Sequence, residues 1–422
     1  MTDVLSPAAA RRAFLLLTVA RWFPVGLVVG IFTLWFLERG LTVSEALVMF
    51  AVTGVVVFAL ELPTGGLADA MGRRPVLLAA AAVNIVAGTV LILGTSFWVF
   101  ALGAALQGVF RALDSGPLEA WYVDTVHTTE PDADVDQTLA TEGSVMGASM
   151  AIGAVVSGGL IVWDPLPAST ALLLPMACWV ALNVLYLAGL LVLMKEPRTH
   201  VDATGLRRAA LSAREAPGVV RDGLGLLRHN GVLLSLVLVE VFWIGALVVF
   251  ETFQPVRLAE LVGGEEQAGA LMGPIAAAGW GVFALGSALA GRSSRRIGVA
   301  RTAILARVLN GLGAVVMGLV TGPAGLIAAY LFTYGLHGSG SPMHSALLHR
   351  EAQARNRATV LSMNSMVFFV AFSIVAPPVG LLAEATTTQV AMVAAGSFSI
   401  LGALLYLPAL RAERRRPQPA SV

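Results

Sequence analysis

The sequence predicts an all-α integral membrane protein with twelve transmembrane helices in two pseudo-symmetric six-helix bundles. Two observations lead to this prediction: hydrophobic residues make up 57% of the 422 positions against 13% charged residues, and apolar runs of membrane-spanning length recur from end to end. About 20 apolar residues in an α-helix cross the hydrocarbon core of a bilayer. A helix also satisfies its own backbone hydrogen bonds, which lipid cannot do. A soluble multidomain protein is therefore excluded.

Apolar runs place each helix in turn, and helix-stop signals separate them. Asp164-Pro165, Gly263-Gly264 and Gly322-Pro323 break the runs where helices are expected to end or begin. The expected helices cover 13–37, 44–68, 76–95, 97–122, 139–162, 169–193, 231–255, 267–290, 299–320, 323–347, 359–383 and 389–410.

The basic residues are sorted by side of the membrane. If both termini face the cytoplasm, 22 of the 27 basic residues lie in cytoplasmic links and only Arg39 and Arg257 in outer ones. Cytoplasmic links of membrane proteins are enriched in lysine and arginine. We therefore expect a multi-pass protein of the cell's inner (plasma) membrane with cytoplasmic N- and C-termini.

The longest polar stretch divides the helices into six and six. The predicted domains are an N-terminal bundle at 1–194, a cytoplasmic linker with an amphipathic helix at 195–230, and a C-terminal bundle at 231–422. The linker's basic residues favour membrane lipids rather than nucleic acid as partners.

The two halves also repeat each other. The spacing Gly65-x-x-x-Asp69-x-x-Gly72 recurs with glycines at 291 and 298, displaced by 226 residues, and Ser115–Ala120 aligns with Gly340–Ser345, displaced by 225. Agreement between the two displacements indicates a duplicated six-helix unit, and such repeats are frequent in transporters.

The link between the second and third helices holds the most specific motif. It reads ELPTGGLADAMGRRPVLL from Glu61 to Leu78. Gly72 can end the second helix and Pro75 can occupy the first turn of the third. A turn that merely keeps arginines in the cytoplasm would explain Arg73 and Arg74, but it does not require Asp69.

The pattern G-x-L-A-D-x-x-G-R-R resembles the signature loop of the major facilitator superfamily, and the 6+6 helices are similar to that family along essentially the whole chain. The resemblance implies a cytoplasmic gate that closes in the outward-open state. The residues to which it gives this role are Gly65, Asp69, Gly72, Arg73 and Arg74. Ala70 departs from the family, which often has a basic residue there. Arg295 stands where the second copy would carry the acid, so we expect a one-sided gate.

Helix 97–122 carries Arg111, Asp114 and Glu119 within the bilayer. Each uncompensated charge there costs about 2.5–3.5 kcal/mol on insertion scales, so all three should face the bundle interior. Arg111 and Asp114, three residues apart, can pair on one helix and leave Glu119 less neutralised. A carboxylate in a partly dehydrated cavity can exchange a proton near neutral pH. We predict proton coupling by Glu119, Asp114 and Arg111, together with His344, which aligns with Glu119 in the second half.

A second group of residues suggests the substrate cavity. Glu240 and Glu251 are eleven residues apart and would share a face of helix 231–255, with Trp243 nearby. Such a face could attract cationic amphipathic compounds. The alternative is that both glutamates are solvated near the helix ends. Arg21 and Trp22 in the first helix complete the predicted cavity, and Arg21 is expected to pair with a buried carboxylate such as Asp114.

The sequence shows neither a P-loop nor a metal-ligand spacing, so no cofactor is expected and a proton gradient is the predicted energy source. The predicted function is alternating-access secondary transport, a proton-coupled efflux of a small amphipathic or hydrophobic compound, similar to the drug–proton antiporters of the superfamily and not enzymatic. A monomer suffices. A nutrient importer or facilitator is the first alternative, because Ala154-Val155 replaces the Gly-Pro that antiporters of the superfamily typically show. A non-transporting receptor or scaffold is a remoter one.

Overall fold

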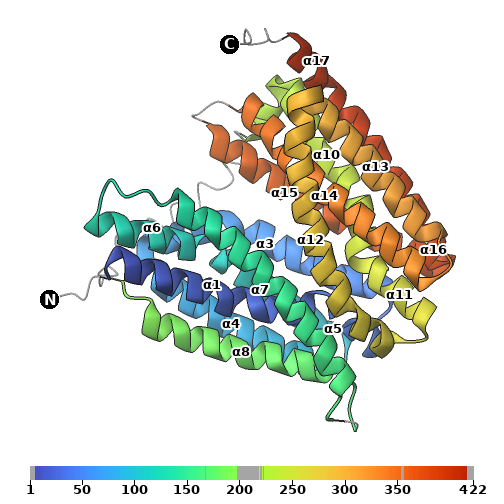
Figure 1. The fold of residues 1–422 in the computed structure, drawn as a ribbon, viewed down its shortest axis with the longest axis horizontal. Coiled ribbons are helices and arrows are strands. Elements are labelled where there is room, and N and C mark those ends of the chain that lie inside the picture. Colours follow the sequence, from blue (N-terminus) through green and yellow to red (C-terminus); the bar gives the residue numbers. More distant parts are fainter. Residues whose placement is uncertain are drawn as a thin grey trace. The chain divides into compact units, whose positions relative to one another are not determined.

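The computed structural model of the chain describes residues 5–166, 168–196, 218, 221, 223–352 and 356–415. At 62, 63, 65, 66, 69, 70, 357 and 358 only the backbone is described. All regular structure in these ranges is helical (Figure 1). The expected fold class is therefore confirmed.

The helices of the first half follow the apolar runs, except that the predicted helix 13–37 is divided into two after Val29. They are α1 (Pro7–Val29), α2 (Phe32–Glu38), α3 (Val43–Met71), α4 (Arg73–Leu93), α5 (Phe97–Asp114), α6 (Pro117–Thr129), α7 (Asp136–Trp163) and α8 (Leu173–Leu193).

Those of the second half are α10 (Gly231–Val248), α11 (Gln254–Val262), α12 (Glu265–Ile297), α13 (Val299–Leu319), α14 (Pro323–Glu351), α15 (Arg357–Ala385), α16 (Thr388–Leu401) and α17 (Leu407–Arg415). A π-helical turn, Val249–Phe253, joins α10 to α11, and a 3₁₀ turn, Gly402–Tyr406, joins α16 to α17.

Eleven helical spans in the described residues are long and apolar enough to cross a membrane. The twelfth expected span corresponds to α14, which has 29 residues but carries the polar stretch HGSGSPMHS in its second half. Those polar residues lower its hydropathy, so the twelve expected runs agree approximately with the structure.

The predicted helix 97–122 is wrong in one respect, because it is two helices. α5 ends at Asp114 and α6 begins at Pro117. Gly116 between them has φ = 93°, a left-handed conformation, and Pro117 cannot donate the backbone hydrogen bond that would continue α5. Glu119 therefore lies on a different helix from Arg111 and Asp114.

The chain divides into two compact units. The first comprises Met1–Leu41, Val52–Ala216 and Gly269–Ala277, and the second comprises Thr42–Ala51, Pro217–Ala268 and Ala278–Val422. Most of the predicted linker, and with it the predicted amphipathic helix, falls on 197–217 and lies outside the described residues. The domain boundaries at 195–230 remain a prediction.

Each unit has its own helix packing. In the first, α1 packs on α7 and α8, α4 packs on α5 and α8, and α6 contacts α1 and α4. Phe14 of α1 stacks on Tyr122 of α6 with ring centroids 4.6 Å apart, in a core that includes Trp121. In the second unit, α13 packs on α14 and α16, and α10 packs on α15 and α16. These contacts place α1 beside α6, and α10 beside α15, where the charged residues lie.

Candidate functional site

A cluster of three charged side chains lies inside the first unit, formed by Arg21, Asp114 and Glu119. Nη2 of Arg21 is 2.5 Å from Oδ2 of Asp114, and Nη1 is 3.7 Å from Oε1 of Glu119. Asp114 is only 2% exposed. The expected contact of Arg21 with Asp114 is present, and one guanidinium serves two carboxylates.

The helix ends explain why these groups meet. Asp114 is the last residue of α5, and Nη2 of Arg21 also donates to its backbone carbonyl at 3.3 Å. Terminal carbonyls of a helix lack an intrahelical donor, and they attract cations. Glu119 lies in the first turn of α6, where the helix dipole favours a negative charge.

Arg111 does not make the pair expected from its spacing. Asp114 contacts Arg21 instead, and Arg111 is exposed and has no ion pair among the described residues. Arg111 also lies near enough to Arg21 for the two cations to repel. The same-helix pairing was wrong because a residue on α1 reaches the buried carboxylate at the end of α5.

Several polar atoms around this cluster are buried without a hydrogen-bond partner among the described residues. They are Oδ1 of Asp114, Oε2 of Glu119, the hydroxyl of Tyr186 and Nε1 of Trp22. Glu142 of α7 also interacts electrostatically with Arg21 and Glu119. Sequence reasoning missed Glu142 and Tyr186, although a carboxylate inside the apolar run 139–162 was a usable signal.

The second unit holds a cavity of about 150 Å³, which we call the C-terminal cavity. Side chains from α10, α13, α14 and α15 line it, and they are predominantly polar. Its lining residues are Glu240, Trp243, Ala306, Arg307, Asn310, Leu336, His337, Gly340, Ser341, His344, Ser345 and Asn364.

An acid–base pair occupies one side of this cavity. Oε1 of Glu240 lies 3.2 Å from Nε2 of His344 and accepts a hydrogen bond from Nδ2 of Asn364 at 3.0 Å. Nδ1 of His344 lies 3.0 Å from the Tyr406 hydroxyl. Glu240 is 8% exposed, so the alternative in which it is solvated at a helix end is wrong. Two residues that the sequence assigned to separate sites are in contact.

Aromatic rings and a cation occupy the other side. The guanidinium of Arg307 lies 4.2 Å from the centre of the Trp243 ring, and Trp243 stacks on His337 at 4.8 Å. The sequence analysis assigned neither Arg307 nor His337 to a site. Histidine and arginine in a membrane-spanning helix were the available signal.

Glu251 differs from Glu240 in its exposure. It is exposed, and it lies within the π-helical turn. Glu251 lies beside Tyr334 of α14, the helix that also carries His344, the partner of Glu240. Its expected role in the cavity remains a prediction.

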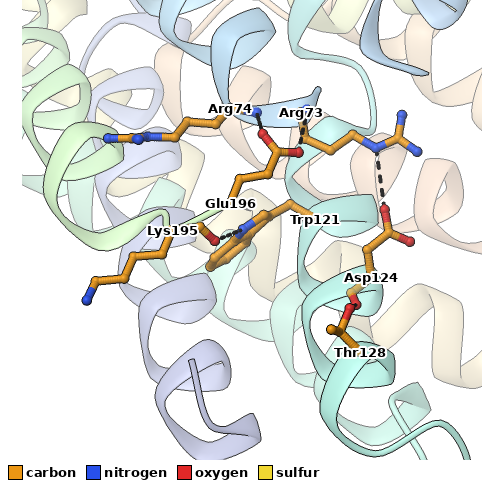
Figure 2. Close-up of polar contacts among 7 residues, drawn as sticks. All are labelled: Arg73, Arg74, Trp121, Asp124, Thr128, Lys195 and Glu196. Carbon is orange, nitrogen blue, oxygen red and sulfur yellow. Dashed lines mark hydrogen bonds and ion pairs between the residues drawn. The ribbon is translucent and has the colours of Figure 1, made fainter. Parts of the chain in front are cut away.

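The start of α4 carries part of the predicted gate (Figure 2). The carboxylate of Glu196 accepts hydrogen bonds from the backbone N–H groups of Arg73 and Arg74 at 2.8 and 2.9 Å. Nε of Arg73 lies 3.6 Å from Oδ2 of Asp124, and Arg74 donates to the Leu191 carbonyl at 2.7 Å. A carboxylate at a helix N-terminus satisfies two unpaired donors and complements the dipole.

The other gate residues are only partly described. Gly72 has φ = 92°, as a glycine ending a helix requires, and Pro75 is in the first turn of α4. Gly65 and Asp69 lie on the α3 backbone, but the Asp69 side chain is outside the described residues. The gate role remains a prediction.

The second unit repeats this construction at the predicted displacement. Gly298 has the same φ of 92° as Gly72. Glu413 accepts hydrogen bonds from the backbone N–H groups of Val299 and Ala300 at 3.1 and 3.0 Å, and lies 2.6 Å from Nη1 of Arg350. A carboxylate therefore caps the equivalent helix in each half, although Glu196 and Glu413 are displaced by 217 residues and not by 226.

Comparison with known proteins decides the family. The family model described as Major Facilitator Superfamily matches residues 14–343 and 275–422. The chain belongs to the major facilitator superfamily. It is therefore a multi-pass membrane protein of a transporter family, and neither the family nor the similar structures point to an enzyme.

Solved structures of other transporters have the same fold as this superfamily member. The nucleoside transporter NupG gives a TM-score of 0.77 at 12% identity, over 95% of this chain and 99% of that one. A peptide transporter POT in complex with sulfate gives 0.72 at 14%, over 96% and 95%. A POT family transporter in complex with 5-aminolevulinic acid gives 0.71 at 13%, over 96% of each chain. At these identities the likeness shows the fold alone. A search of curated proteins found no match.

Proposed function

We propose that this chain couples the entry of protons to the export of a small amphipathic or hydrophobic compound across the cell's inner membrane, with both termini in the cytoplasm. The observation that carries the proposal is the Arg21–Asp114–Glu119 cluster, in which one guanidinium lies between two carboxylates. The proton gradient is then the energy source, and no cofactor is required.

Charge balance explains why such a cluster can bind a proton. One arginine can neutralise one carboxylate fully, so the second carboxylate of the cluster carries the less compensated charge. Glu119 is the group less closely paired, with a side chain 34% exposed and one oxygen buried without a partner. It is the proposed proton-binding residue, and it shares the guanidinium of Arg21 with Asp114.

The same contacts provide a link between protonation and movement. Arg21 belongs to α1, Asp114 ends α5 and Glu119 begins α6, so the cluster joins three helices. Protonation of Glu119 removes one attraction on Arg21 and weakens the tie between α1 and α6. A ligand can only shift a conformational equilibrium by its differential affinity for the two states, and this tie supplies such a difference for the proton.

The remaining expectations belong to the same proposal. Asp69, Arg73 and Arg74 form the cytoplasmic gate, the C-terminal cavity receives the transported compound, and the protein works as a monomer among membrane lipids. A facilitator or importer is the second candidate, favoured by Ala154-Val155 in α7 where antiporters of the superfamily typically show Gly-Pro.

Inside-out vesicles with a respiration-driven pH gradient test the coupling. A dye quenched by the gradient is followed while lipophilic cations, antibiotics, organic acids and sugars are added one at a time. We expect at least one compound to cause dequenching in wild type and in Glu130→Gln, which removes an exposed carboxylate at the end of α6. Glu119→Gln and Asp114→Asn should abolish the response.

Two outcomes would count against the proposal. Substrate-driven proton movement that persists in Glu119→Gln at every pH would remove Glu119 from the coupling. Uptake of a labelled compound down its own gradient, with no proton movement in wild type, would support the facilitator instead.

A further inference from the structure

We propose that the C-terminal cavity binds the carboxylate of a small organic acid, with Arg307 as the anion anchor. This inference rests on the proposed transport function and narrows its substrate to an amphipathic acid. It also replaces the cationic substrate that the acidic residues of helix 231–255 suggested with an anionic one.

Arg307 is a buried cation without a close counter-ion in the described part of the chain. It is 8% exposed, it takes part in no ion pair there, and its Nε has no hydrogen-bond acceptor. Its neighbours are the Trp243 ring, the Tyr406 hydroxyl and, at longer range, Glu240. A buried charge is costly unless it is paired, so an anion entering the cavity gains the interaction that the protein leaves open. The planar guanidinium also matches a carboxylate in geometry.

Asn310 supplies the complementary polar atom. It lies three residues after Arg307 on α13 and therefore near the same face. Its Nδ2 donates to the Thr333 carbonyl at 2.9 Å, which leaves Oδ1 buried without a donor although the residue is only 1% exposed. An unmatched buried donor and an unmatched buried acceptor thus line one cavity. A ligand carboxylate would contact Arg307 where its side chain lines the cavity.

The other residues that line the C-terminal cavity limit the size and polarity of the ligand. A cavity of about 150 Å³ admits a small organic acid. Trp243 and Leu336 offer apolar surface to its carbon skeleton. Oε1 of Glu240 already contacts His344 and Asn364, so this oxygen is less available to a cationic ligand.

Equilibrium binding to the purified full-length protein tests the proposal without any gradient. The probes are benzoate and benzamide, which share a ring and nearly a shape but differ in charge, and binding is followed by calorimetry. We expect benzoate to bind at least tenfold more tightly than benzamide. Arg307→Gln should lower benzoate affinity at least tenfold, about 1.4 kcal/mol, and leave benzamide unchanged. Arg301→Gln, an exposed arginine on the same helix, is the matched control and should bind as wild type does.

Two further variants guard against loss of folding. Arg307→Lys keeps the charge without the planar fork and should bind benzoate more weakly than wild type but more tightly than Arg307→Gln. Asn310→Leu keeps Arg307 and fills the cavity, so it should lower the affinity for benzoate.

The proposal is overturned if wild type binds benzoate no better than benzamide, which is also the result expected if the cavity holds only water. It is equally overturned if benzoate affinity is unchanged in Arg307→Gln or, where that variant aggregates, in both Arg307→Lys and Asn310→Leu. Glu119→Gln separates this inference from the proposed function, because a variant without proton coupling should still bind benzoate. Benzoate binding without proton movement in wild type would refute only the coupling.

Discussion

Removing one partner of the Arg21–Asp114 pair should destabilise the protein more than removing both. The two groups are 2.5 Å apart, and their side chains are 12% and 3% exposed. Breaking a buried ion pair by removing one partner costs about 3–5 kcal/mol, because the remaining charge is buried unpaired, whereas apolar replacement of both is often nearly neutral. Arg21→Met and Asp114→Leu should therefore each be costly, and the double variant should recover most of the loss.

The contact of Arg21 with Glu119 predicts which of the two single variants should be less stable. Arg21→Met leaves two carboxylates without their cation, so its cost should lie near the upper end, about 5 kcal/mol. Asp114→Leu leaves Arg21 with Glu119 at 3.7 Å, so its cost should lie near the lower end, about 3 kcal/mol.

Wild type, the two single variants and the double variant form a double-mutant cycle. The stability of each is measured by thermal unfolding of the purified protein, followed by tryptophan fluorescence. Arg11→Met, an exposed arginine of the same helix, is the control and should change stability by no more than about 0.5 kcal/mol. A coupling energy of more than about 4 kcal/mol is expected, because the double variant should recover more than half of the summed single costs. Strictly additive single costs would refute the pairing. If Asp114→Leu were less stable than Arg21→Met, Glu119 would not be the second carboxylate that Arg21 neutralises.

Two further predictions concern helix ends. Glu196→Ala should destabilise the start of α4 by about 1–2 kcal/mol, because two backbone donors lose their acceptor, and Glu413→Ala should do the same at α13. Hydrogen exchange of the capped amides measures both effects, and unchanged exchange would contradict the capping. Gly116→Ala should cost about 1–3 kcal/mol of stability, since φ = 93° is strained for any residue with a side chain. Gly143→Ala is the control, because open space surrounds that glycine, and it should be neutral or stabilising. Equal melting temperatures of the two variants would argue against a rigid break between α5 and α6.

The helical framework was predictable because its signals are local. A run of apolar residues and a glycine or proline at its end act through the chain's immediate neighbours. α7 ends at Trp163, before Asp164-Pro165, and α14 begins at Pro323. The missed break at Gly116-Pro117 had the same kind of signal, but it lies inside a stretch that is predicted as a single span. The π-helical turn after α10 had none.

The candidate site was predictable as a set of residues but only partly as a set of contacts. Arg21, Asp114, Glu119, Glu240 and His344 stood out because charged or titratable groups are costly in a membrane. The structure brings Glu240 to His344 across 104 positions of sequence. The local pairing expected for Arg111 failed for the same reason, since a distant partner was better placed.

By itself the sequence determined that this chain crosses a membrane many times, where most of its helices begin and end, and which polar groups must turn inward. Those conclusions follow from the cost of placing each residue in lipid, a cost that each position carries almost independently. Only the tertiary structure decided that Arg21 neutralises Asp114, that Glu240 is held by His344 and Asn364, and that Arg307 is left beside an open cavity. Pairing depends on distances of a few ångströms between helices far apart in the chain, and these distances arise only when the helices pack.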